Sequence, residues 1–122
     1  MTIDEFSLAA TTNDLSREPD AREAADFIEF RMDSAKNPIS QISDYDGELP
    51  IIATNRAKWF GGEADDSGRL DHLFAAARFD AVEMVDIEVE TTRGKHWILD
   101  EFRENDVGII TSFHGFEETP DQ

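Results

Sequence analysis

Charged and polar side chains recur at every second position in two short, largely apolar segments. Glu29, Arg31 and Asp33 do so in the first segment, and Thr54 and Arg56 do so in the second. Because successive side chains of a β-strand point to opposite faces of a sheet, each set is expected to share one face. Charges of both signs on one interior face require partners or a ligand. The spacing therefore indicates a site for a polar ligand.

Two later segments continue this pattern. Asp86 and Glu88 alternate with apolar residues, and Ser112 and His114 follow at the same spacing. The imidazole of His114 could transfer protons, although a single histidine is more often structural than catalytic. The common face of the four segments would then carry Glu29, Arg31, Asp33, Thr54, Arg56, Asp86, Glu88, Ser112 and His114.

The position of this face within a fold decides whether it is a site. Several of its residues fall at the carboxyl ends of predicted strands, which is where the active sites of (β/α)8 barrels lie. The same alternation also occurs in an open sheet that has helices on one side only, and its polar face then contacts water. The periodicity alone leaves both interpretations open.

Alternating strands and helices must position this face. The apolar runs predict strands at residues 6–10, 26–33, 50–56, 84–89 and 107–113. Helices are predicted at residues 19–25, from the N-cap Asn37 onward, from Asp66 or Ser67 to Ala77, and at residues 95–105. Strands separated by helices imply right-handed βαβ units and a parallel sheet. Residues 1–122 contain no visible linker, so one α/β domain is predicted.

The charge balance restricts the partners and the habitat. The 122 residues contain 28 acids against 11 lysines and arginines, for a net charge of −17. Such a charge repels nucleic acid and anionic membranes. An acidic composition with only three lysines is also the pattern expected of a protein from a high-salt cytoplasm. The start of the chain lacks a signal peptide, and no run approaches the ~18 apolar residues of a membrane span. A cytoplasmic protein is therefore expected.

Several kinds of chemistry lack the residues that they need. The chain has no cysteine, and its histidines do not occur in pairs at metal-ligand spacing, so no metal site is predicted. His72 and His96 lie in helical patterns and are expected at the surface. Neither a glycine-rich phosphate loop nor the GxSxG elbow of serine hydrolases is present.

Four segments together resemble a known family, the type I 3-dehydroquinate dehydratases. Residues 28–33 are similar to its glutamate-x-arginine-x-aspartate strand, and residues 54–62 to its threonine-x-arginine segment ending in glutamate-glycine-glycine. Residues 85–89 resemble its aspartate-x-glutamate strand, and residues 112–120 resemble its histidine motif. The segments occur in the family order and span nearly the whole chain.

This resemblance implies the N-terminal half of a (β/α)8 barrel, with about five strands, as part of a single barrel domain. It also implies an enzyme of the shikimate pathway, a lyase that converts 3-dehydroquinate to 3-dehydroshikimate through a lysine Schiff base. By position His114 would be the catalytic acid and base. Glu29, Arg31, Arg56 and Ser7 would contact the substrate. Neither a metal nor an organic cofactor is implied.

The chain departs from the family pattern in three places. It ends at Gln122, before the strand that carries the family's lysine, and its three lysines (Lys36, Lys58 and Lys95) do not match that position. Phe60 stands where the family has a glutamate that supports the histidine, and Gly115 replaces the aspartate after the histidine. We therefore expect no turnover by this chain alone, and expect a homodimer or a complex with a complementary C-terminal half.

Two other functions are compatible with these departures. The first is a non-catalytic half-barrel that binds a small polyhydroxy acid or assembles with a partner chain. The second is a split enzyme whose remaining strands belong to a separate polypeptide. Binding without turnover would distinguish the first, and restoration of activity on mixing would distinguish the second.

Overall fold

Five parallel strands form a single sheet in the computed structural model, which describes residues 8–112. The strand order is β1-β2-β3-β4-β5, and each strand pairs in parallel with the next one along the chain. The strands are β1 (Ala9–Thr12), β2 (Phe27–Arg31), β3 (Ile51–Thr54), β4 (Val82–Glu88) and β5 (Gly108–Ser112). This sequential parallel order confirms the predicted βαβ topology.

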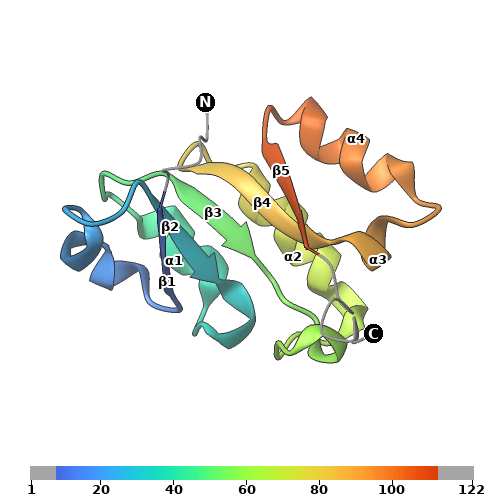
Figure 1. Cartoon of the computed structure of the whole chain (residues 1–122), viewed down its shortest axis with the longest axis horizontal. Helices are drawn as coiled ribbons and strands as arrows, with labels where there is room; N and C mark the ends of the chain where they lie inside the picture. Colours follow the sequence, from blue (N-terminus) through green and yellow to red (C-terminus); the bar gives the residue numbers. More distant parts are fainter. Residues whose placement is uncertain (1–7, 113–122) are drawn as a thin grey trace, which may run out of the picture.

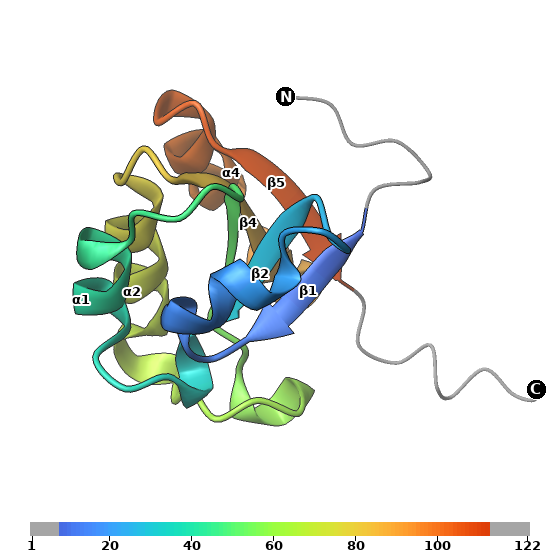
Figure 2. The same cartoon turned by 90° about the vertical axis from the view of Figure 1, so that its left-hand side faces the viewer.

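The connections between strands contain the helices. The longer ones are the 3-10 helix η1 (Leu15–Ala21) and the α-helices α1 (Pro38–Asp44), α2 (Asp66–Ala77) and α4 (His96–Glu104). Shorter turns follow the strands directly: η2 (Met32–Ser34), η3 (Lys58–Phe60) and α3 (Val89–Thr92). Figure 1 shows α1 and α2 behind the sheet, and Figure 2 shows them together on one side of it. No helix within residues 8–112 is both long enough and apolar enough to cross a membrane.

The main core lies between the helices and one face of the sheet. Its strand residues alternate as predicted, with Ile28 and Phe30 from β2 and Val85 and Ile87 from β4. Burial of these apolar side chains provides the principal force that holds helices on the sheet. The helix partners are chiefly Ile42, Leu73, Ala76, Ile98 and Phe102.

The opposite face changes character along the strands. Toward their amino ends it carries the buried apolar side chains of Phe27 and Ile52. Glu29 and Thr54 lie two residues further along the same strands and on the same face. This face is therefore apolar at the amino ends of the strands and polar at their carboxyl ends.

The first βα unit differs from the sequence prediction. The first strand runs from Ala9 to Thr12 instead of residues 6–10, because these four residues pair with Phe27–Phe30. The helix after it is a 3-10 helix that begins at Leu15, not an α-helix at residues 19–25. Asp14 caps it by accepting a hydrogen bond from the Ser16 amide at 3.0 Å. Pro19 lies inside this helix instead of opening it.

Smaller differences occur at other element boundaries, and β2 and β3 end two residues before their predicted ends, at Arg31 and Thr54. Asn37 occupies the predicted cap position, but it has a φ of 48° and its side chain makes no capping hydrogen bond. Asp65 precedes α2, where Ser67 and Gly68 have non-helical backbone angles that kink its first turn. The fourth strand begins at Val82, because Val82 pairs with Ile51. His72 and His96 are exposed, as predicted.

Candidate active site

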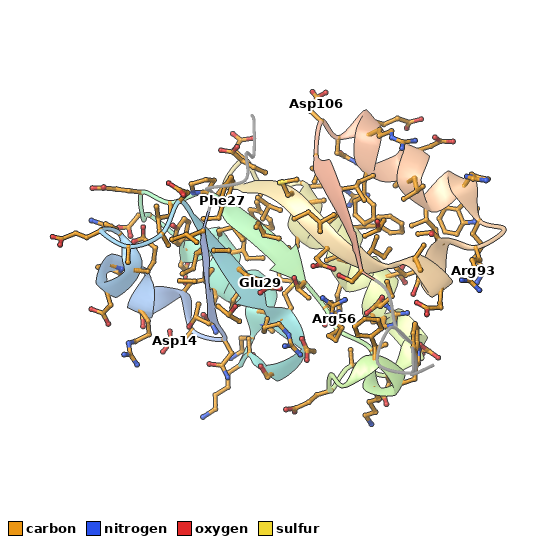
Figure 3. All side chains as sticks on the ribbon, viewed as in Figure 1. Asp14, Phe27, Glu29, Arg56, Arg93 and Asp106 are labelled. Atoms are coloured by element: carbon orange, nitrogen blue, oxygen red, sulfur yellow. The ribbon has the colours of Figure 1, made fainter. Side chains whose placement is uncertain are left out.

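The carboxyl ends of β2, β3, β4 and β5 bring together a network of charged side chains. Figure 3 labels Glu29 and Arg56 toward this edge, while Phe27 lies nearer the amino ends of the strands. The network consists of two groups that each join residues far apart in the sequence: the first is Thr11, Glu29 and Thr54, and the second is Arg31, Asp33, Arg56, Asp86, Glu88 and Ser112. The polar face is thus internally paired rather than a set of isolated hydrated charges.

Glu29 is held between the two strands that flank it. Thr11 Oγ1 on β1 donates a hydrogen bond of 2.8 Å to one carboxylate oxygen of Glu29. Thr54 Oγ1 on β3 donates a bond of 2.9 Å to the other. Two hydroxyl donors leave lone pairs on both oxygens, since an ionised carboxylate has about four acceptor sites. Glu29 is therefore oriented and can still accept hydrogen bonds from a ligand hydroxyl.

Arg31 and Asp33 form a paired salt bridge at the end of β2. Arg31 Nε and Nη2 donate hydrogen bonds of 2.9 and 2.8 Å to the two oxygens of Asp33. Burial opposes ionisation of Asp33, but the bonds from Arg31 and the backbone outweigh burial and hold the pKa of this carboxyl below its ordinary value. The Asp33 carboxylate in turn raises the pKa of Arg31. Both groups therefore remain charged at neutral pH.

Asp33 also binds the loop that follows β3. Its carboxylate accepts hydrogen bonds from the amides of Arg56 at 3.2 Å and of Glu63 at 3.1 Å. The loop closes on itself, since the Gly62 amide donates to Ala57 O at 2.8 Å. A Cβ on Gly62 would lie only 2.2 Å from the Arg56 carbonyl oxygen, so only glycine fits there.

Arg56 lies between two acids of β4 and one aromatic ring. Its Nη2 is 3.1 Å from Asp86 Oδ1, and its Nη1 is 3.4 Å from Glu88 Oε2. The guanidinium carbon lies 4.8 Å from the centre of the Phe60 ring, a cation–π contact. Ser112 Oγ on β5 donates a hydrogen bond of 2.7 Å to the same Asp86 oxygen. Arg56 is thus paired directly with β4 and, through Asp86, is linked to Ser112 of β5.

Arg69 joins the network from the helix side, and the sequence analysis did not identify it. It is 6% exposed. Its Nη1 donates to Glu88 Oε1 at 3.0 Å, and its Nη2 donates to Thr91 Oγ1 at 2.7 Å. The helical pattern of α2 predicted only its apolar face, and periodicity does not distinguish a buried arginine from an exposed one.

The predicted site residues are thus partly brought together. Glu29, Arg31 and Arg56 occupy one edge and one face, as expected. Ser7 and His114 lie outside the residues that the structure describes. Asp33, Asp86 and Glu88 were expected on this face, and the structure adds that they hold the arginines in place.

Parallel strands in sequential order with helices on one side have the arrangement of part of a (β/α)8 barrel, and the charged residues lie at the edge where that fold has its active sites. The family model described as type I 3-dehydroquinase matches residues 8–122. The chain belongs to this type I 3-dehydroquinase family. A crystal structure of 3-dehydroquinate dehydratase from Geobacillus kaustophilus has the same fold, with a TM-score of 0.68 at 20% identity. The alignment covers 86% of this chain and 48% of that one.

Curated relatives extend this result to halophilic archaea. The 3-dehydroquinate dehydratase of Haloarcula marismortui is 44% identical over 128 residues, covering 100% of this chain and 56% of the relative. That of Halobacterium salinarum is 46% identical over 127 residues, covering 98% and 56%. The chain spans about half the length of the curated relatives that it matches. The expectations of the family and of the partial barrel are confirmed, and the halophilic organisms of these relatives fit the expected halophilic composition.

Proposed function

We propose that the chain supplies the substrate-binding and acid–base half of a 3-dehydroquinate dehydratase, a lyase of the shikimate pathway. The observation that carries the proposal is the convergence of Glu29, Arg31 and Arg56 on one polar edge, each held by a partner from the same network. Relatives at 44% and 46% identity have the name 3-dehydroquinate dehydratase, which supports the same reaction.

The chemistry of the substrate suits these groups. 3-Dehydroquinate has a carboxylate, hydroxyl groups and a ketone. Arg31 and Arg56 bind the anionic and polar groups through charge-assisted hydrogen bonds, and Glu29 accepts bonds from hydroxyls. Ser7 is a further substrate contact. The reaction requires no metal or organic cofactor.

We assign proton transfer to this chain and imine formation to a lysine outside residues 1–122. A lysine from outside these 122 residues forms a Schiff base with the ketone, and the iminium makes the adjacent carbon acidic. His114 accepts that proton and then protonates the departing hydroxyl, so that water leaves. Because the lysine is supplied elsewhere, the chain alone is expected to bind substrate without converting it.

A partner would complete the barrel. We propose that residues 1–122 form part of one barrel domain, in which β1 and β5 are the outer strands of the five-stranded sheet. Outer strands present unpaired backbone groups, which another chain can pair with. The partner is a complementary C-terminal half, with a second copy of this chain as the alternative. The reaction is placed in a high-salt cytoplasm, as the acidic composition predicts.

One observation favours a second function, binding without catalysis. Phe60 stacks on Arg56 at the position where the family has a glutamate that supports the histidine. An aromatic ring cannot orient or charge-stabilise an imidazole as a carboxylate does. In this alternative the chain binds a polyhydroxy acid, but His114 is a poor base.

The test uses a fusion protein made of residues 1–122 followed by the part of the Haloarcula marismortui relative that this chain does not cover. Turnover of 3-dehydroquinate in molar KCl is followed by the absorbance of 3-dehydroshikimate, and borohydride reduction followed by mass spectrometry reports the imine. We expect turnover and a trapped adduct with the fusion protein, and neither with the isolated chain.

Variants and mixing complete the design. His114→Ala in the fusion protein should abolish turnover but leave the adduct, while Arg17→Met, a change at an exposed helix, should leave both unchanged. Separate halves that regain activity on mixing would support a split enzyme. A fusion protein that binds 3-dehydroquinate and forms the adduct without turnover would favour the non-catalytic alternative, and Phe60→Glu should then raise the rate.

A further inference from the structure

Two arginines share one buried carboxylate beneath the proposed substrate site. Glu88 is 1% exposed, and the four hydrogen bonds that it accepts within residues 8–112 divide evenly between its oxygens. Oε2 accepts from Arg56 Nη1 at 3.4 Å and from the Ala57 amide at 3.1 Å. Oε1 accepts from Arg69 Nη1 at 3.0 Å and from Thr91 Oγ1 at 3.1 Å. One side of Glu88 thus faces the site, and the other faces α2.

The distances indicate which arginine forms the stronger ion pair with Glu88. Its bond to Arg69 is 0.4 Å shorter than its bond to Arg56 (3.0 against 3.4 Å). Arg69 is also fixed by further contacts, with Asp66 at 3.2 Å and over the Trp59 ring at 5.6 Å. A guanidinium anchored on several sides loses little further freedom when it binds a carboxylate. Arg69 is therefore the principal counter-ion of Glu88.

The charge count explains why this matters for Arg56. Without Arg69, one guanidinium would face both Asp86 and Glu88, two carboxylates whose side chains are 13% and 2% exposed. Little solvent would screen that excess of negative charge, which would repel an incoming carboxylate. Most of the N–H donors of Arg56 would then be used in hydrogen bonds to Asp86 and Glu88. With Arg69 present, two arginines face these two acids, and the third acid that contacts Arg69, Asp66, has a side chain that is 72% exposed.

We propose that Arg69 is a positioning residue for Arg56. By neutralising Glu88 from the helix side, it keeps that carboxylate from capturing Arg56, whose charge and remaining donors then bind the carboxylate of a polyhydroxy acid. Among the contacts within residues 8–112, Arg56 uses Nη1 and Nη2 once each as hydrogen-bond or ion-pair donors. A guanidinium has five N–H donors. This role rests on the proposed function, which assigns Arg56 to the substrate.

The test measures kcat and KM of the fusion protein separately in molar KCl. Arg69→Met removes the charge and keeps an apolar side chain of similar length. We expect it to raise KM for 3-dehydroquinate by roughly tenfold, the size of one charge-assisted hydrogen bond, with a smaller change in kcat. In the double variant Arg69→Met/Glu88→Gln the excess charge is absent, and KM should return to within about twofold of the starting value.

Two further variants separate positioning from a merely structural role. Arg17→Met removes an exposed arginine, whose side chain is 69% exposed, and should leave KM unchanged. If Arg69→Met does not fold, Glu88→Gln is compared with the double variant, and loss of Arg69 should then have no further effect on KM. A KM that is unchanged in Arg69→Met would overturn the proposal. A KM raised equally in the single and double variants would also overturn it.

The design also distinguishes failure of the proposal from failure of the proposed reaction. If the fusion protein does not turn over, calorimetric titration with 3-dehydroquinate gives Kd for the same variants, with the same pattern expected. That outcome would contradict the proposed dehydration reaction but would support the role of Arg69 in positioning Arg56. A fusion protein that binds no 3-dehydroquinate at all would overturn both.

Discussion

Asp33 binds Arg31 through two parallel hydrogen bonds of 2.8 and 2.9 Å, although the two residues lie on successive elements, β2 and η2. The same carboxylate accepts the amides of Arg56 and Glu63 from the loop after β3. A single buried acid thus orients one proposed substrate-binding arginine and fixes the backbone of the other. Asp33 is therefore expected to be sensitive to substitution.

Replacing Asp33 by asparagine should lower the stability of the protein and change its dependence on pH. An amide cannot pair with Arg31 and with two backbone amides at once, so a loss of about 1–3 kcal/mol in the free energy of unfolding is expected near neutral pH. The folded-state pKa of Asp33 lies below its ordinary value of 3.8. Its contribution is therefore complete above that value and is lost as pH falls through the lower folded-state pKa.

Urea unfolding in molar KCl, at a series of pH values from neutral to acid, measures this prediction. Asp14, Glu18 and Asp66 also have lowered pKa values and contribute to the acid response of both proteins. The difference between the two proteins isolates Asp33, and it should shrink as pH falls. Asp20→Asn, in an exposed pair, serves as the control. A difference that is constant with pH would show that Asp33 is not held ionised by the fold.

The single tyrosine of the chain gives a spectroscopic prediction. Burial, together with the nearby Glu18 carboxylate, raises the pKa of Tyr45 to about 12. Its hydroxyl donates a hydrogen bond of 2.6 Å to the Leu49 carbonyl. Because the folded state favours the neutral phenol, stability is full below pH 10 and is lost as pH rises through the folded-state pKa.

Ultraviolet absorbance of the phenolate follows this titration directly, since no other tyrosine is present. The midpoint of the Tyr45 titration should lie well above pH 10 for the folded protein in molar KCl. For the protein unfolded in urea it should return to near pH 10. Tyr45→Phe provides the blank. A midpoint near 10 in the folded protein would mean that the hydroxyl is hydrated and not bonded to Leu49.

Two adjacent glycines should respond differently to alanine. Gly61 has a φ of 91° with open space around its missing side chain, so Gly61→Ala should cost about 1–2 kcal/mol from backbone strain alone. At Gly62 an added methyl group would overlap the backbone of Arg56. Gly62→Ala should therefore destabilise the protein more and should also displace Arg56.

Thermal unfolding measures the loss of stability in each variant. The KM of the fusion protein for 3-dehydroquinate shows whether Arg56 has been displaced. Only Gly62→Ala is expected to raise KM substantially, because only that change moves the Arg56 backbone. If Gly61→Ala were the more damaging substitution, the close contact between Gly62 and Arg56 would not be rigid.

The net charge of −17 predicts a strong dependence of stability on salt. Mutual repulsion among acids opposes the compact state, and the screening length falls from ~30 Å at 0.01 M to ~3 Å at 1 M salt. The midpoint of thermal unfolding should rise steeply as KCl increases to molar concentrations. Circular dichroism melts over this range test the prediction, and a midpoint that does not change with KCl would contradict it.

Much of the fold follows from local patterns. Period-two alternation predicted which residues of β2 and β4 face the helices, and the placement of Ile28, Phe30, Val85 and Ile87 in the core confirms it. The first βα unit was predicted wrongly, because four small residues at 9–12 lack a strong apolar signal and take their strand conformation from pairing with β2. Cap positions were similarly ambiguous, since backbone angles at Asn37, Ser67 and Gly68 depend on tertiary contacts.

The sequence by itself determined the family, the parallel order of the strands and the common face of Glu29, Arg31 and Arg56. These properties follow from residue types at short, regular spacing, and spacing is visible in one dimension. Only the tertiary structure decided which charge pairs with which. Asp33 reaches the loop 23 and 30 residues ahead of it, and Arg69 reaches Glu88 from a helix. Such pairs depend on strand register and on the direction of each side chain, neither of which local periodicity contains.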